Sequence, residues 1–326
     1  SDPMPAAAPL PWAHRGMLSL LAIASFAPYP YATFTPDTAR DLHAALAIVD
    51  GVDYPLAGSV IGGLFHVGPL WFYVLALGVA LTHSLAGASL YVGVLAALEF
   101  PLAYLTGKTL GGPRTGFWVA AAAAIPGTAA VESLTWSHVN LIATAAWLAL
   151  WCAANAWRHH DDPRWVLGTG AALGLALQAH PTAIVLAPLL LVQIVARRRC
   201  DAGSAVALLG AVVLAAAPFA PAIVDSFGRD NGETAMASAI VANVRQSGIS
   251  GAPAIVHSLL FTIPDLAAGA YLHRGGVPGA AWTIAQRLIW LVALAGAWRS
   301  ALRGPRTTRA LLALATVATL AAISFV

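Results

Sequence analysis

Carboxylates and a guanidinium gather between residues 33 and 70 of a chain that is otherwise poor in charge. Asp37 and Asp41 are one helical turn apart, and Arg40 lies between them, so the three side chains can share one side of a helix. Two carboxylates and a guanidinium together can bind a metal, hold a phosphate, or let one acid act as a general base. Solvated surface charge is the alternative.

The local sequence predicts how these groups are positioned. Thr35 followed by Pro36 is typical of a helix start, with threonine as the N-cap and proline at the first helical position. Asp37 then falls in the first turn, where an acid also complements the helix dipole without any catalytic role. Asp50 and Asp53 bracket a glycine, which predicts a turn.

The composition predicts the environment of this segment. Hydrophobic residues make up 59% of the chain and charged residues 10%, and the mean hydropathy is +0.75. Apolar stretches near twenty residues match a hydrocarbon core of about 30 Å, where the backbone must be satisfied within helices. We therefore predict an all-α, polytopic transmembrane bundle that forms one domain over residues 1–326. A pI near 9.1 needs no nucleic acid to explain it.

Basic residues set the predicted orientation, because cytoplasmic loops are enriched in Arg and Lys. With a cytoplasmic amino terminus in the plasma membrane, 12 of the 17 basic residues fall at cytoplasmic ends. Two long external loops then cover residues 34–84 and 224–280. The nine predicted spans lie near residues 16–33, 85–107, 115–132, 139–157, 165–179, 181–196, 204–223, 281–301 and 307–326.

This scheme requires that Pro69–Thr82 does not cross the membrane. The stretch is apolar, but at about 14 residues it is short for a span, and a crossing would turn every later Arg-rich loop to the outside. We therefore expect a helix that lies in the outer interface, with Trp71, Phe72 and Tyr73 at headgroup depth. The four aspartates at 37, 41, 50 and 53 then face outward.

Histidine is the other residue type here that could bind a metal. His66, His138 and His180 all map to the outer ends of predicted helices. A carboxylate with two imidazoles can bind a divalent metal, so His66 and His138 are candidate ligands. The alternative is that each histidine caps a helix end or hydrogen-bonds a headgroup.

Three short motifs resemble the GT-C membrane glycosyltransferases. They are Pro36-Asp-x-x-Arg-Asp41, Asp50-Gly-x-x-Tyr-Pro55 and Phe65-His-x-Gly-Pro-Leu-x-x-Tyr73. The chain looks most similar to the branch with protein O-mannosyltransferases and the bacterial enzyme that adds aminoarabinose to lipid A, over roughly residues 15–200. The resemblance implies a catalytic acid on a juxtamembrane helix of the first external loop, a polyprenyl-phosphate sugar donor, and inversion at the anomeric carbon.

The resemblance also implies residue roles. Asp37 falls at the position of the family's catalytic Asp and would be the general base, with Asp41 as its helper. Many members have Asp-Glu where this chain has Asp37–Thr38, and Val67 stands where the lipid A branch has a lysine. External arginines must therefore be considered for the donor phosphate. The predicted substrate-binding residues are Arg40, His66, Glu132, His138, Arg245, Arg274 and Arg287.

We predict an integral-membrane glycosyltransferase that acts at the periplasmic face on an acceptor hydroxyl of a lipid, glycan or protein. It requires no cofactor, with a divalent metal as an open alternative. A transporter or flippase of a lipid-linked glycan is a competing class, with Glu99 inside a span as a proton-coupled site. Inverted repeats, typical of carriers, are not visible. A non-catalytic GT-C-like subunit is the third alternative.

Overall fold

The computed structural model describes residues 12–26, 29–31, 34–61, 65–123, 137–159, 162–190, 193 and 202–222. Its α-helices are α1 (Trp12–Phe26), α2 (Pro36–Val49), α3 (Leu70–Thr82), α4 (Leu85–Ala97), α5 (Glu99–Gly111), α6 (Pro113–Ala123), α8 (Ile142–Arg158), α9 (Pro163–Ala179) and α11 (Ala202–Ala216). The short elements are the 3-10 helices η1 (Tyr29–Tyr31), η2 (His138–Leu141), η3 (Pro181–Leu186) and η4 (Ala217–Phe219), and the strands β1 (Val60–Ile61) and β2 (Phe65–His66). The predicted helical character is confirmed.

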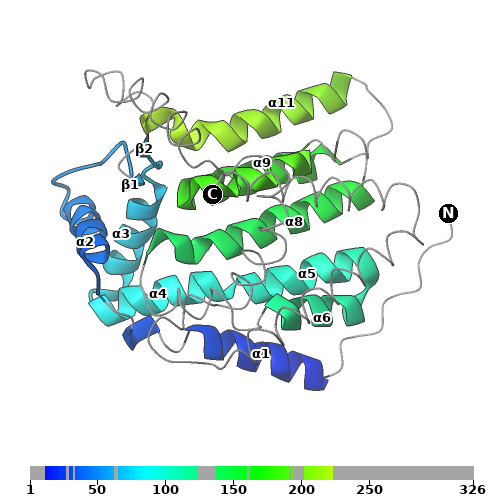
Figure 1. The fold of residues 1–326 in the computed structure, drawn as a ribbon, viewed down its shortest axis with the longest axis horizontal. Coiled ribbons are helices and arrows are strands. Elements are labelled where there is room, and N and C mark those ends of the chain that lie inside the picture. The colour runs from blue at the N-terminus through cyan, green and yellow to red at the C-terminus, as the bar shows by residue number, and fades with distance from the viewer. Residues whose placement is uncertain are drawn as a thin grey trace, which may run out of the picture.

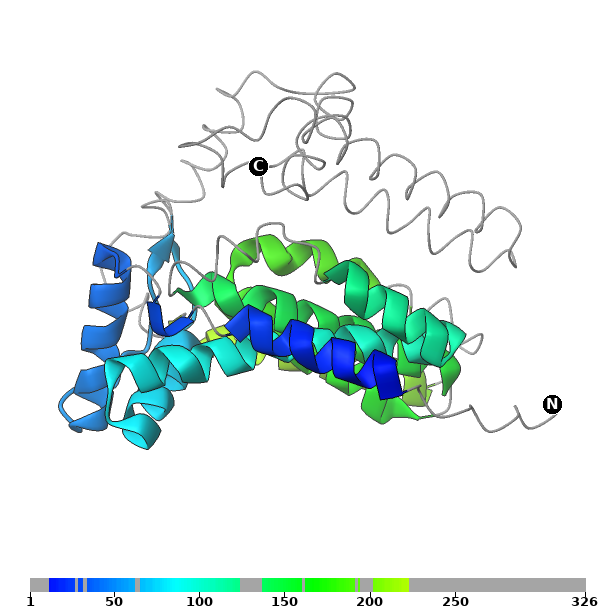
Figure 2. The same cartoon turned by 90° about the horizontal axis from the view of Figure 1, so that it is seen from below.

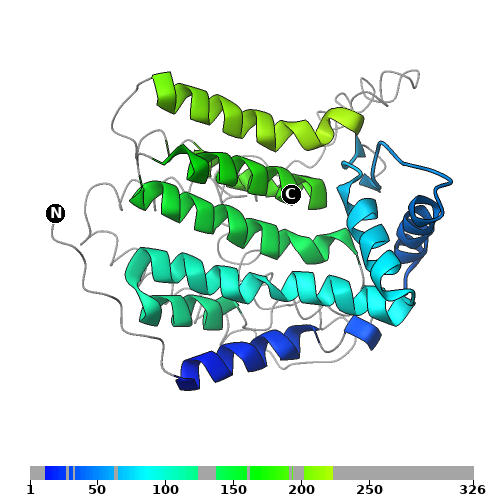
Figure 3. The same ribbon diagram turned by 180° about the vertical axis from the view of Figure 1, so that it is seen from behind.

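The helices form two groups with different directions. Helices α1, α4, α5, α6, α8, α9 and α11 run side by side as a bundle (Figure 1), and the same layer is seen from behind in Figure 3. Helices α2 and α3 and the β1–β2 hairpin lie at one end of this bundle, and α2 runs across the bundle direction (Figure 2). Helix α3 packs on α2 and α4 and also contacts α9. Helix α3 thus lies outside the bundle, and that it does not cross the membrane stays a prediction.

Two described helices are long and apolar enough to cross a membrane, at Leu85–Gly111 and Ala202–Ala222. Helix α6 ends at Ala123, and the predicted span 181–196 begins as the 3-10 helix η3 rather than as an α-helix. The last two predicted spans lie outside the described residues. The number of spans therefore stays a prediction.

Pro101 explains the break between α4 and α5. Proline has no backbone N–H, so the helix is interrupted one turn before it, and α4 and α5 meet at Leu98. The hydroxyl of Thr144 on α8 contacts the carbonyl oxygens of Leu95 at 3.0 Å and Ala96 at 2.8 Å. Neighbouring helices satisfy the backbone near such breaks in membrane proteins.

Small residues let α9 and α11 pack closely. A Cβ on Gly170 would lie 2.1 Å from the carbonyl oxygen of Ala211, and one on Gly174 would lie 2.8 Å from that of Leu214. Ala211 and Ala215 are buried in the same contact. Small residues four apart are typical of helix contacts in membranes, where backbones approach directly.

One side of helix α3 is buried within the protein. Trp71 and Phe72 are 4% and 6% exposed and pack with Leu42 of α2 and Val92 of α4. Their rings are therefore covered by protein, and their depth in the membrane stays a prediction. The rings are covered because α2 covers one side of α3 and α4 another, and a helix that is apolar all round is typically a buried one.

Candidate functional site

Helix α2 begins as the sequence predicts. Thr35 is the N-cap, its hydroxyl oxygen accepts from the backbone N–H of Thr38 at 3.2 Å, and Pro36 is the first helical residue. Asp37 lies in the first turn, and its side chain is 74% exposed. At the other end, Asp50 is the C-cap and is followed by Gly51 at a φ of +69°, which confirms the predicted turn.

Arg40 connects the two carboxylates of α2. Its Nη1 donates to Oδ1 of Asp37 at 2.9 Å. Its Nε and Nη2 donate to Oδ1 of Asp41 at 3.0 and 2.8 Å, and Nη2 also donates to the Ser59 hydroxyl at 2.9 Å. The guanidinium side chain remains 46% exposed. Arg40 thus joins an exposed acid to a buried one.

Asp41 is saturated with hydrogen bonds. It is 1% exposed, and its Oδ1 also accepts from the Ser59 hydroxyl at 2.9 Å. Its Oδ2 accepts from the indole Nε1 of Trp71 at 2.8 Å. A buried carboxylate needs such partners, and here they come from α2, the hairpin and α3. We call Asp37, Arg40, Asp41, Ser59 and Trp71 the acid cluster.

The β1–β2 hairpin carries His66, and Ser59 just before it bonds to Arg40 and Asp41 of α2. The backbone N–H of Gly58 donates to Val67 at 2.7 Å, and that of Val67 donates to Ser59 at 3.0 Å, which extends the ladder beyond the two strands. His66 Nδ1 lies 2.9 Å from the carbonyl oxygen of Gly58. Because a carbonyl only accepts, this nitrogen carries the proton. The other ring nitrogen, Nε2, is the one that a metal or substrate could meet.

Two histidines lie close together, His138 in η2 just before α8 and His180 at the C-terminal end of α9. The rings of His138 and His180 are nearly parallel, at 6°, with centroids 6.2 Å apart. Burial lowers the pKa of His138, Asp41 raises it, and His180 and Arg40 lower it. Burial also lowers the pKa of His180. Both imidazoles are therefore favoured in their neutral form, and His138 lies within the electrostatic reach of the acid cluster.

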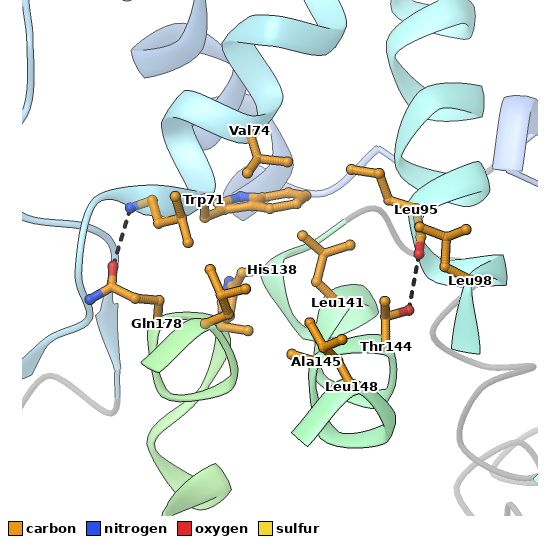
Figure 4. Close-up of a pocket in the computed structure, with 13 residues that line it drawn as sticks. Trp71, Val74, Leu95, Leu98, His138, Leu141, Thr144, Ala145, Leu148 and Gln178 are labelled. Atoms are coloured by element: carbon orange, nitrogen blue, oxygen red, sulfur yellow. Dashed lines mark hydrogen bonds between the residues drawn. The ribbon is translucent and has the colours of Figure 1, made fainter. Parts of the chain in front are cut away.

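An apolar pocket of about 180 Å³ lies next to the acid cluster, between α3, α4, α8 and α9 (Figure 4). The ring of Trp71 lines it on one side, and the side chains of His138 and Gln178 also line it. Trp71 therefore belongs to the pocket and to the cluster at once, since its Nε1 reaches Asp41. The arrangement can hold an apolar group beside the ring of Trp71.

Comparison with known proteins indicates a family for part of this chain. Residues 66–224 match the family model described as dolichyl-phosphate-mannose-protein mannosyltransferase. Those residues belong to that family of GT-C membrane glycosyltransferases. No curated protein and no solved structure matches the chain.

The match to the dolichyl-phosphate-mannose-protein mannosyltransferase family covers just under half of the chain. It includes α3, both stacked histidines and the pocket. Asp37, Arg40 and Asp41 precede it, so their roles stay predictions. The family confirms a membrane glycosyltransferase that uses a lipid-phosphate sugar donor, and the plasma membrane and the orientation stay predictions.

Several predicted site residues lie outside the described part of the chain. They are Glu132, Arg245, Arg274 and Arg287. Within the described ranges, no group of three or more histidine, cysteine or acidic side chains is close enough to hold a metal ion. A metal held by His66 and His138 therefore stays a prediction, without a third ligand in the described part of the chain.

Three residues of the site were not predicted from the sequence. Ser59 carried no signal, because a serine in a loop is common. Trp71 was expected in the interface, although an indole that is buried usually needs a partner for its N–H. Gln178 had a usable signal, since it is a polar residue inside an apolar span, and such residues typically mark functional positions.

Proposed function

We propose that this protein transfers a sugar from a polyprenyl-phosphate donor to an acceptor hydroxyl at the outer face of the plasma membrane, with inversion at the anomeric carbon. The observation that carries the proposal is the contrast within the acid cluster. Asp37 is exposed and contacts one guanidinium nitrogen, whereas Asp41 is buried and saturated. Membership of a GT-C glycosyltransferase family supplies the class of reaction.

Asp37 is the general base in this proposal. Its carboxylate accepts the proton of the acceptor hydroxyl while that oxygen attacks the anomeric carbon. The bond from the anomeric carbon to the phosphate oxygen breaks, and the electron pair leaves with the lipid phosphate. A positioned base near a good leaving group contributes about 10²- to 10⁴-fold to the rate.

Asp41 acts through Arg40 and is a positioning residue. It fixes two guanidinium nitrogens, so that the third can hold Asp37 in one orientation. Its own oxygens accept from Arg40, Ser59 and Trp71, which leaves little capacity for a substrate proton. The catalytic pair implied by the resemblance thus divides into a base and a support.

The donor phosphate is proposed to lie near the outer ends of α8 and α9. Arg40 is the described arginine of the first loop, and its half-exposed guanidinium can contribute positive charge there. Arg245, Arg274 and Arg287 are the further candidates from the sequence. The chemistry as written balances without a metal, and a divalent ion would only assist the departure of the phosphate.

A turnover assay tests this function. Purified protein receives radiolabelled polyprenyl-phosphate mannose and a panel of hydroxyl acceptors comprising Ser/Thr peptides, glycans and lipids. We expect free polyprenyl phosphate and glycosylated acceptor to form in equal amounts. Translocation of the intact donor across liposomes, with no product formed, would instead support a flippase and would overturn the proposal.

A further inference from the structure

The indole of Trp71 holds one oxygen of the buried carboxylate of Asp41. The Nε1–H of Trp71 donates to Oδ2 of Asp41 at 2.8 Å, and the two residues are 4% and 1% exposed. Within the described residues, the other hydrogen bonds of Asp41 come from Arg40 and Ser59 and all end on Oδ1. The two oxygens of this carboxylate are therefore held by different partners.

The contacts of Arg40 show what this division does. An arginine and a carboxylate commonly pair as a fork, in which two guanidinium nitrogens each donate to an oxygen of their own. Here Nε and Nη2 of Arg40 both donate to Oδ1 of Asp41, at 3.0 and 2.8 Å, while Oδ2 accepts from the indole. Nη1 reaches Oδ1 of Asp37 at 2.9 Å. The guanidinium thus spans the two carboxylates.

Without the indole N–H, this arrangement would have a competitor. The terminal torsion of an aspartate has broad energy wells, so the carboxylate of Asp41 could rotate and offer Oδ2 to the guanidinium. A fork between Arg40 and Asp41 would satisfy that oxygen, and a buried acceptor left without a donor is costly. The same fork would turn Nη1 away from Asp37, whose exposed side chain would then be free to change rotamer.

The rest of the Trp71 side chain is surrounded by apolar groups. Its ring lines the pocket together with Leu95, Leu98 and Leu141, whose side chains carry no hydrogen-bond donor (Figure 4). It also belongs to a buried apolar cluster that contains Leu42 of α2. The N–H is therefore the polar part of a side chain that is otherwise held by packing, and a phenylalanine here would keep a ring and remove that donor.

We propose that Trp71 is a positioning residue for the sugar transfer. Its N–H holds Asp41 in the orientation that lets Arg40 contact both carboxylates, and Arg40 in turn keeps the Asp37 carboxylate where it meets the acceptor hydroxyl. Trp71 acts through Asp41 and Arg40 and takes no proton itself. This inference rests on the proposed role of Asp37 as the general base.

Steady-state kinetics of Trp71→Phe test the route of this effect, with polyprenyl-phosphate mannose as the donor. We expect kcat to fall about tenfold, because a hydrogen bond to a charged group is lost, and KM for the donor to stay unchanged, because Arg40 keeps its charge. In the Asp41→Ala background the same substitution should lower kcat no further, since the acceptor of the indole is absent. An equal loss in both backgrounds, as independent sites give, would overturn the inference.

The chemical reactivity of Arg40 tests the positioning without turnover. Phenylglyoxal modifies guanidinium groups, and peptide mass spectrometry of the folded protein in detergent measures the rate of modification at Arg40. We expect this rate to rise about tenfold in Trp71→Phe, because Nη1 loses its hydrogen bond to Asp37.

Trp165→Phe is the matched control, because Trp165 is a partly buried indole that packs edge-on against Trp151. It should leave both kcat and the reactivity of Arg40 at the wild-type values. A wild-type rate of Arg40 modification in Trp71→Phe would overturn the inference. Faster modification in Trp71→Phe, together with a wild-type protein that never transfers sugar, would sink the proposed function and leave the hold of Trp71 on Arg40 standing.

Discussion

Asp37 and Asp41 are separated by one turn of α2, yet their surroundings are opposite. Asp37 is open to solvent, and Asp41 is enclosed by Arg40, Ser59 and Trp71. Their spacing could be predicted from sequence, since it needs only helical geometry. The division of roles could not, because the indole that reaches Asp41 comes from a helix that begins about thirty residues later.

Replacing Asp41 by alanine should destabilise the protein. The buried Trp71 N–H would lose its partner, which costs about 1–3 kcal/mol for such a donor, and Arg40 and Ser59 would lose theirs. Thermal unfolding followed by tryptophan fluorescence measures the change. Asp37→Ala is the control and should leave the unfolding temperature unaltered, because its side chain is exposed. Equal unfolding temperatures for Asp41→Ala and wild type would contradict the role given to Asp41.

At the scale of elements, caps, turns and helix bounds could be predicted from neighbouring residues, whereas contacts between elements could not. The N-cap at Thr35, the turn after Asp50 and the helix over residues 70–82 were predicted correctly from residue types alone. The burial of Trp71 was not. An apolar helix of this length looks the same whether lipid or protein covers it, and its partners α2 and α4 were not identifiable from its own sequence.

The contact between α9 and α11 gives a prediction for these elements. Gly170→Ala should lower the unfolding temperature, because the added Cβ would meet the backbone oxygen of Ala211 at 2.1 Å, and overpacking costs about 1–3 kcal/mol. Helix propensity alone would favour alanine. Gly16→Ala in α1 is the matched control, since a Cβ on Gly16 would meet no described atom within 4 Å. A Gly170→Ala protein as stable as Gly16→Ala would show that α9 and α11 do not pack in this way.

At the scale of the whole molecule, the orientation in the membrane is a prediction from counting charges. The distribution of arginine required residues 34–84 to stay on one side, and the structure places α2, the hairpin and α3 together at one end of the bundle (Figure 2). Sequence alone could not show that a pocket forms beneath them. Its wall combines residues of four helices, and Leu70 and Gln178 are more than a hundred residues apart.

The predicted sidedness can be measured with single cysteines in a variant that lacks Cys152 and Cys200. A membrane-impermeant maleimide should label Asp50→Cys in intact spheroplasts, because Asp50 is exposed at the end of α2 and faces outward in the proposed topology. Arg114→Cys, exposed in the first turn of α6 at the opposite end of the bundle (Figure 1), should react only after lysis. The reverse labelling pattern would invert the topology and move the acid cluster to the cytoplasm.

The central claim is that Asp37 takes the proton of the acceptor. Single-turnover transfer from polyprenyl-phosphate mannose by Asp37→Asn protein measures this directly, with donor binding determined in the same sample and Asp50→Asn as the matched control. We predict that Asp37→Asn binds the donor as wild type does and transfers the sugar about 10²- to 10⁴-fold more slowly. Transfer by Asp37→Asn at the rate of the Asp50→Asn protein would contradict the account.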